Sequence, residues 1–252
     1  MSKVIVIVGD THGEIFKIND CVRHARKNGY DVISAIQVGD FGLYDFPTWN
    51  KYKQNKSTFD VKTLTTFGNH ESPLEVRKLM GDENAVKNFY LFKQIEIKEI
   101  DGLRIMSVGG AMSVDKMGDT THVPHWNGIF HEAITEWFKM GKPHVDIIVT
   151  HEAPNKSGLH SNPVIAEKYG VTSELGSQEL RDLITEVGPK IQVNGHHHTW
   201  NNCQIGKTDC WTLPIPFCSS AFWNSFSLSG YGLIDVETLR FTPIHMIDGV
   251  DY

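Results

Sequence analysis

Short apolar runs that stop at a glycine and a polar residue recur along this chain. Residues 4–8 are all β-branched and lead directly into Gly9 and Asp10. Two later runs end in the same way, residues 32–38 before Gly39-Asp40 and residues 63–67 before Gly68-Asn69. A short, continuously apolar run predicts a buried strand. We therefore expect three parallel strands, each with polar side chains at its carboxyl end.

Between and after these runs the apolar residues return at helical spacing. Residues 14–28 form an amphipathic pattern that stops before Gly29, as expected for a helix with a glycine after its last turn. Similar patterns over 127–140 and 173–187 predict two more helices. Each of these two precedes a further apolar run, 145–149 and 191–193. The alternation of strand and helix predicts an α/β fold.

The remaining strand signals favour antiparallel pairs. Residues 95–100 alternate apolar and charged side chains, Asp101-Gly102 is a turn dipeptide, and 103–108 follow, which predicts a β-hairpin. The tail from 203 to 246 contains short β-rich runs between Pro, Gly and Asp, and we expect these to be antiparallel strands that close a second sheet. Repeats and linkers are absent from the sequence, so we expect a single domain over 1–252.

Composition narrows the class of protein. With 40% hydrophobic and 21% charged residues, the 252-residue chain is typical of a globular protein. A net charge of −6 disfavours nonspecific binding to a nucleic-acid backbone. The four cysteines form no C-x-x-C pair, which favours reduced thiols. Signal-peptide features and long apolar spans are absent from the sequence, so we expect a cytoplasmic protein without a membrane partner.

Metal-ligand side chains follow the predicted strands at five points. These are Asp10-Thr11-His12, Gly39-Asp40, Gly68-Asn69-His70-Glu71, Thr150-His151-Glu152 and Gly195-His196-His197-His198. Catalytic groups of open α/β sheets gather at the carboxyl ends of the strands. Carboxylate and imidazole together suit first-row divalent metals, and two such ions support phosphoester hydrolysis. The pattern therefore predicts a two-metal hydrolytic site.

In their order, these five segments closely resemble the calcineurin-like metallophosphoesterase superfamily, in particular its bacterial and phage-type members. The resemblance covers residues 9–198. It implies a four-layer α/β/β/α sandwich of two mixed β-sheets, the metallophosphoesterase type of α/β fold. It also implies a cofactor of two divalent metal ions, which could be Mn, Fe, Zn or Ni, with Mn favoured.

The resemblance also implies a role for each motif residue. The first metal would be held by Asp10, His12, Asp40 and His198, and the second by Asp40, Asn69, His151 and His196. Asp40 would bridge the two ions. His70 would not be a ligand but would assist the leaving group as a general acid. By the period-2 rule His197 should point away from its neighbours, and Glu71 and Glu152 are either partners of ligand histidines or surface carboxylates.

One departure from the family pattern bears on the substrate. Phosphomonoesterases of the family continue Gly-Asp-x-x-Asp-Arg, whereas Leu43 and Tyr44 stand in the place of that Asp and Arg. The missing Arg would grip a dianionic phosphate in a bidentate manner, which Tyr cannot do. The departure favours the phosphodiesterase-like branch and disfavours a protein Ser/Thr phosphatase, although Asp45 or Arg77 could replace the missing groups in space.

The segment between the third and fourth motifs is the candidate substrate wall. Residues 109–116 and the following loop resemble a segment of bacterial and phage-type members, and they supply four candidate substrate contacts: Asp115, Lys116, His122 and His125. For Lys116 and the two histidines, ordinary solvent-exposed loop positions are the equal alternative.

Three functions remain open from the sequence. The first is a phosphodiesterase or phosphatase that acts on a nucleotide or another small molecule. The second is a nuclease acting on DNA or RNA ends, for which Lys51, Lys53 and Lys56, with Trp49 and Tyr52, form the only compact basic-aromatic stretch. The third is a catalytically inactive interaction module, which the intact ligand set argues against. Substrate identity and oligomeric state cannot be read from the sequence.

Overall fold

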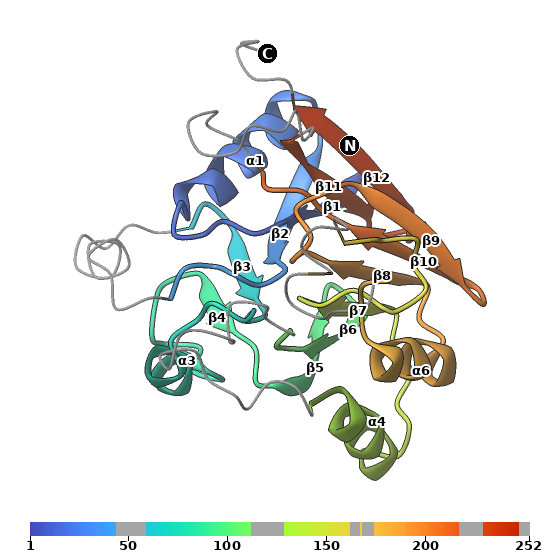
Figure 1. Cartoon of the computed structure of the whole chain (residues 1–252). Helices are drawn as coiled ribbons and strands as arrows, with labels where there is room; N and C mark the ends of the chain where they lie inside the picture. Colours follow the sequence, from blue (N-terminus) through green and yellow to red (C-terminus); the bar gives the residue numbers. More distant parts are fainter. Residues whose placement is uncertain (44–58, 112–128, 162–166, 168–173, 217–228, 247–252) are drawn as a thin grey trace.

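The computed structural model describes residues 1–43, 59–111, 129–161, 167, 174–216 and 229–246. These residues form two six-stranded sheets with helices on their outer faces (Figure 1). Described helices long and apolar enough to cross a membrane are absent.

The first sheet is built around the β-branched run at the start of the chain. Its strands, in spatial order, are β12 (Phe241–Met246), β11 (Ser229–Asp235), β1 (Lys3–Val8), β2 (Asp31–Gln37), β3 (Lys62–Thr65) and β4 (Phe89–Leu91). The strands β1, β2 and β3 are parallel, as predicted. The short β4 extends this parallel set and was not expected from the sequence. The strand β11 is antiparallel to β1, and β12 to β11.

The second sheet contains the predicted hairpin. Its strands, in spatial order, are β5 (Ile95–Ile100), β6 (Leu103–Val108), β7 (Ile147–Thr150), β8 (Ile191–Asn194), β10 (Thr208–Thr212) and β9 (Asn201–Ile205). The pair β5 and β6 is antiparallel around Asp101-Gly102, whereas β6, β7, β8 and β10 run parallel. Both sheets are therefore mixed, as the resemblance implied.

The strands of the tail do not all join the second sheet, which corrects the sequence prediction. The hairpin β9–β10 extends that sheet, but β11 and β12 close the first sheet beside β1. Six of the seven residues of β11 are buried, so this strand needs neighbours on both faces. Its place beside the buried β1 supplies them, and local sequence pattern does not encode that choice of sheet.

The helices form the two outer layers. On the first sheet lie α1 (Phe16–Lys27) and, near β4, the short α3 (Pro73–Leu79), while α4 (Ile129–Lys139) and α6 (Gln178–Val187) lie together on the second (Figure 1). Along β1 the side chains alternate, since Val4, Val6 and Val8 pack in the cluster that includes α1. Ile5 and Ile7 face the core between the sheets. Burial on both faces explains the continuous apolar run, and the four-layer prediction is confirmed.

The helix α6 begins later than predicted. Leu175, which the sequence pattern placed inside the helix, lies before it and donates its backbone N–H to Leu159 O at 3.1 Å. Gly176 has a φ of +100°, which no right-handed helix contains. Ser177 caps the helix instead, because its side chain accepts a hydrogen bond from Leu180 N at 3.2 Å.

Candidate metal centre

Two groups of ligand side chains form where the motif loops of both sheets meet. In the first group, His198 Nε2 lies 2.9 Å from Asp10 Oδ2 and 3.0 Å from His12 Nε2. One ligand atom from each of these three residues lies within 4.8 Å of the others. The strands β1 and β8 come from different sheets, so the group exists only once the sandwich has formed.

The second group joins Asp40, His151 and His196 with the same mutual limit of 4.8 Å. His151 Nε2 lies 3.3 Å from Asp40 Oδ1 and 3.2 Å from Asn69 Oδ1. On the other side of the ring, Nδ1 donates to Val38 O at 2.9 Å. The backbone hydrogen bond fixes the ring so that Nε2 faces the two oxygens.

A single oxygen atom of Asp40 is the most informative feature of the site. Asp40 Oδ2 is buried and has no hydrogen-bond partner among the residues that the structure describes. A buried carboxylate oxygen without a partner is costly, and it calls for a proton or a cation. The side chain of Asp40 contacts the second group through Oδ1 and leaves Oδ2 for another positive charge. The donor set therefore fits divalent metals.

The backbone of the site is held in an unfavourable conformation. Four non-glycine motif residues have φ between 44° and 68°, namely His12, Asp40, His196 and His198. For such residues this left-handed region costs about 1–3 kcal/mol each, and it concentrates at functional sites. Surrounding structure offsets that cost here, because the backbone N–H groups of Thr11 and His12 both donate to Asp40 O.

Two motif glycines are needed for close approach. A Cβ at Gly68 would lie 2.2 Å from Asp40 Oδ1, and a Cβ at Gly195 would lie 2.0 Å from Asp10 Oδ1. Both distances are far below van der Waals contact. Any larger residue at either position would displace a carboxylate of the site.

Burial and the nearby carboxylates shift the pKa values of the site histidines in different directions. Burial lowers the pKa of His12, and it lowers that of His196 to about 4, so both rings are neutral near pH 7. Burial opposes charge on His151 as well, but the Asp40 and Asp10 carboxylates outweigh it and raise the pKa of His151 to about 10. Burial likewise opposes charge on Asp40, but His151 holds the pKa of that carboxyl below its usual range.

Glu71 joins two motif loops. Its side chain is buried, with Oε1 accepting from Gly42 N at 3.0 Å and Oε2 accepting from Gly68 N at 2.5 Å. Burial raises the pKa of Glu71 to about 7, and the charge of Asp40 acts in the same direction. The alternative of a surface carboxylate is therefore wrong for Glu71. It contacts the backbone rather than a ligand histidine.

Glu152 is buried too, and it contacts the histidine triplet. Its Oε1 accepts from His197 Nε2 at 3.0 Å, and its Oε2 lies 3.8 Å from His196 Nε2. These three residues form a third group whose ligand atoms lie within 4.8 Å of one another. His197 belongs to neither of the first two groups. Glu152 thus steadies the loop between β8 and β9 and is not a surface carboxylate.

His70 lies at the solvent-facing side of the two groups. Its side chain is 30% exposed, and its Nε2 lies 3.8 Å from Asp40 Oδ2. Its backbone N–H donates to Asp40 Oδ1 at 3.1 Å, which ties its position to the proposed bridging residue. The ring can therefore reach a bound molecule without leaving the site.

The remaining candidate residues from the sequence lie either away from the two ligand groups or outside the described residues. Leu43 is fully buried in the first core cluster, and Arg77 is exposed on α3. Several candidates lie outside the described residues, namely Tyr44, Asp45, Lys51, Lys53, Lys56, Asp115, Lys116, His122 and His125.

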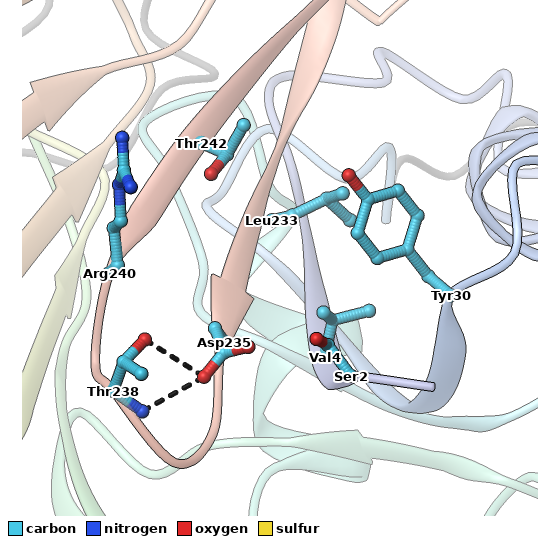
Figure 2. Close-up of a pocket in the computed structure, with 8 residues that line it drawn as sticks. All are labelled: Ser2, Val4, Tyr30, Leu233, Asp235, Thr238, Arg240 and Thr242. Carbon is cyan, nitrogen blue, oxygen red and sulfur yellow. Dashed lines mark hydrogen bonds between the residues drawn. The ribbon is translucent and has the colours of Figure 1, made fainter.

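A separate hollow of about 310 Å³ lies at the amino-terminal end of β1, away from the ligand residues at its carboxyl end. Figure 2 shows it between Tyr30 and the β11–β12 hairpin, with Val4 and Leu233 among the residues that line it. Asp235 is engaged within the hairpin, where it accepts from Thr238 N at 2.8 Å. Since its lining includes none of the motif residues, this hollow is not the reaction site.

Comparison with known proteins decides the family. The model of the calcineurin-like phosphoesterases matches residues 3–200. This chain belongs to the calcineurin-like phosphoesterase family. The resemblance predicted from the motifs is thus confirmed. Members of this family are hydrolases that cleave phosphoester bonds at binuclear centres of divalent metals, and the groups around Asp10 and Asp40 match such a centre.

The curated relative that the chain matches is distant in sequence. A lariat debranching enzyme from Entamoeba histolytica is 26% identical over 189 residues, which is 68% of this chain and 50% of the relative. The chain therefore spans about half the length of that curated relative.

Solved structures support the fold. The protein TT1561 of Thermus thermophilus has a TM-score of 0.65 at 13% identity, over 97% of this chain and 99% of that one. GAP50, described as the anchor in the inner membrane complex of Plasmodium, has a TM-score of 0.53 at 12% identity, over 98% and 90% of the chains. Because proteins of such different description share the fold, the argument for function rests on the site.

Proposed function

We propose that this calcineurin-like phosphoesterase hydrolyses a phosphodiester of a nucleotide or another small molecule with two divalent cations. The first cation would be held by Asp10, His12, Asp40 and His198. The second would be held by Asp40, Asn69, His151 and His196. When bound, such a pair of ions activates water and neutralises charge on the phosphoryl group.

The second oxygen of Asp40 carries this proposal. Asp40 Oδ1 lies in the group around His151, whereas Oδ2 is buried and has no hydrogen-bond partner among the described residues. A carboxylate can be shared by two cations, and a buried carboxylate that lies within reach of ligand histidines and keeps one oxygen without a hydrogen bond suits that role. The neutral amide of Asn69 adds a donor atom beside His151 without adding negative charge.

The protein's own groups would complete the reaction. His70, tied to Asp40 through its backbone and partly exposed, is placed to donate a proton to the leaving oxygen. A general acid of this kind contributes about 10²–10⁴-fold to the rate. The buried Glu71 and Glu152 would keep the loops of the ligands in place.

The buried side chain of Leu43 supports a preference for phosphodiesters. The side chain is fully buried in the core, so this position offers the phosphate no polar group. Its backbone carbonyl accepts from Ser72 N at 2.9 Å, which keeps the loop in this orientation. A diester carries less charge than a monoester and depends less on the missing Arg clamp. A protein Ser/Thr phosphatase is accordingly the less favoured activity.

A nuclease on DNA or RNA ends is the second candidate, because the curated relative is named as a lariat debranching enzyme. The net charge of −6 weighs against it. Aromatic side chains after His198 could stack on nucleic-acid bases, but Trp211 instead stacks on Phe241 with ring centroids 4.5 Å apart and packs within the protein. An inactive module is disfavoured because Asp10, Asp40 and His151 are all buried, and burying ionisable groups is costly.

The test compares two substrates on metal-stripped protein supplied with Mn²⁺, the metal we favour. We expect turnover of bis-(p-nitrophenyl) phosphate to exceed that of p-nitrophenyl phosphate. Asp40→Asn should abolish both activities, while the exposed Asp31→Asn should leave them unchanged. Preferred turnover of the monoester would contradict the diesterase proposal, and metal-independent turnover would contradict the two-metal site. The cytoplasmic location remains a prediction.

A further inference from the structure

Two cysteines that form no C-x-x-C pattern face each other across a β-hairpin. Cys203 in β9 and Cys210 in β10 are directly opposite partners in the antiparallel register. The hairpin turns through Gly206 and Lys207, so the two strands pair immediately on either side. Both cysteines carry free thiols in the structure. Their sequence spacing gave no sign of this pairing.

The register alone brings the two thiols within reach of a disulfide bond. Directly opposite residues of an antiparallel pair have Cα atoms about 4.5 or 5.5 Å apart, and their side chains emerge on the same face. A disulfide requires Cα atoms about 4.4–6.8 Å apart. Both side chains pack in the same apolar cluster beneath α6. Closure therefore needs only small adjustments of the side chains.

The surroundings give the two thiols unequal roles. Cys210 is buried against the layer of α6, whereas Cys203 is partly exposed on the outermost strand. The neighbouring Cys210 thiol lowers the pKa of Cys203 to about 7 against the opposing effect of burial, and the nearby Arg181 acts in the same direction. The same contact and burial raise the pKa of Cys210. Cys203 is thus the accessible nucleophile.

We propose that Cys203 and Cys210 are a thiol–disulfide modification site, which small-molecule disulfides such as oxidised glutathione convert to an intramolecular disulfide. Cys203 Sγ attacks one sulfur of oxidised glutathione, and the first glutathione leaves as a thiolate. Cys210 then loses its proton and attacks the sulfur of Cys203, which releases the second glutathione. The two cysteines are oxidised and one glutathione disulfide is reduced to two thiols, so atoms and electrons balance.

The bond would join the free edge of the second sheet to its interior. Among the described strands, β9 is the last of that sheet, and β10 pairs with β8. An edge strand opens more readily than a central one, because it has a neighbour on one side. The disulfide would hold β9, the strand that follows the His196–His198 loop, closed against β10. This inference is independent of the proposed phosphoesterase activity.

The experiment uses the full chain, reduced and then equilibrated in glutathione redox buffers. Free thiols are alkylated without reduction, and tryptic peptides are identified by mass. Trypsin cleaves after Lys207 in the turn, so the disulfide should link peptide 191–207 to peptide 208–240. The second peptide also contains Cys218, so the same mapping is done on Cys218→Ser. We expect the link in the wild type and in Cys218→Ser, and its loss in Cys203→Ser and Cys210→Ser.

A second measurement does not depend on substitutions. In the oxidised wild-type protein, amide hydrogen exchange of residues 201–205 should slow relative to the reduced protein. Three results would overturn the proposal: separate alkylation of both cysteines after equilibration in excess oxidised glutathione, a stable glutathione adduct on Cys203, or loss of the link in Cys218→Ser. Each of them means that the pair does not close.

Discussion

His151 directs its Nε2 atom at Asp40 Oδ1, 3.3 Å away, from the opposite sheet of the sandwich. Its Nδ1 atom donates to Val38 O, and Nε2 faces oxygens that can only accept from it or share a cation with it. Without metal, a proton must therefore occupy the position in which a metal would bind. The nearby carboxylates of Asp40 and Asp10 accordingly raise the pKa of His151 to about 10.

Metal binding should release this proton. A folded pKa raised above the usual value of about 6.5 stabilises the metal-free fold fully below that pH, and the gain is lost as the pH rises through about 10. Binding of Mn²⁺ near pH 7 must displace the proton, so metal affinity should increase with pH over this interval. Calorimetric titrations in buffers of different ionisation enthalpy measure the release. A binding enthalpy that is the same in all buffers would contradict the expected exchange of proton for metal.

Glu71 should control metal affinity through the backbone. In Glu71→Gln an amide N–H₂ replaces one acceptor oxygen and faces the N–H of Gly42 or Gly68, which separates the loops of Asp40 and Asn69. Loss of such outer contacts weakens metal binding by about 10–100-fold. Glu186→Gln, an exposed change on α6, is the matched control. Equal Mn²⁺ affinities of the two variants would show that the contact does not position the ligands.

His70→Ala should separate catalysis from metal binding. The ring belongs to neither metal group, so the variant should retain both ions. Its kcat should fall by about 10²–10⁴-fold, as expected for a lost general acid. The loss should shrink for esters with better leaving groups, which need less protonation. The exposed His160→Ala serves as the control, and loss of bound metal in His70→Ala would assign the residue to the ligand set instead.

The parts of the molecule that could be predicted from sequence are those encoded locally. The run of residues 4–8 predicted a buried strand, because a strand covered on both faces has no polar positions. The start of α6 was misplaced, since Leu175 fits the helical spacing while Gly176 adopts a positive φ. The sheet to which β11 belongs depends on a distant partner, β1, which no local pattern records.

In the candidate site, too, local sequence predicted some features and tertiary structure determined the others. The motif residues could be placed together because parallel strands end at one edge of a sheet. The sequence left Glu71 and Glu152 undecided between buried and exposed positions, because burial is a property of the tertiary structure. The pairing of Cys203 with Cys210 was missed for a related reason, since it follows from the register of β9 and β10.

The central claim is that Asp40 bridges two ions, and electron paramagnetic resonance of the Mn²⁺-loaded protein tests it most directly. The site residues predict two Mn²⁺ ions per chain with an exchange-coupled spectrum. His12→Ala, which removes a ligand of the first ion only, should leave a single uncoupled Mn²⁺. A wild-type protein that binds one Mn²⁺, or two without magnetic coupling, would contradict the bridge and with it the two-metal site.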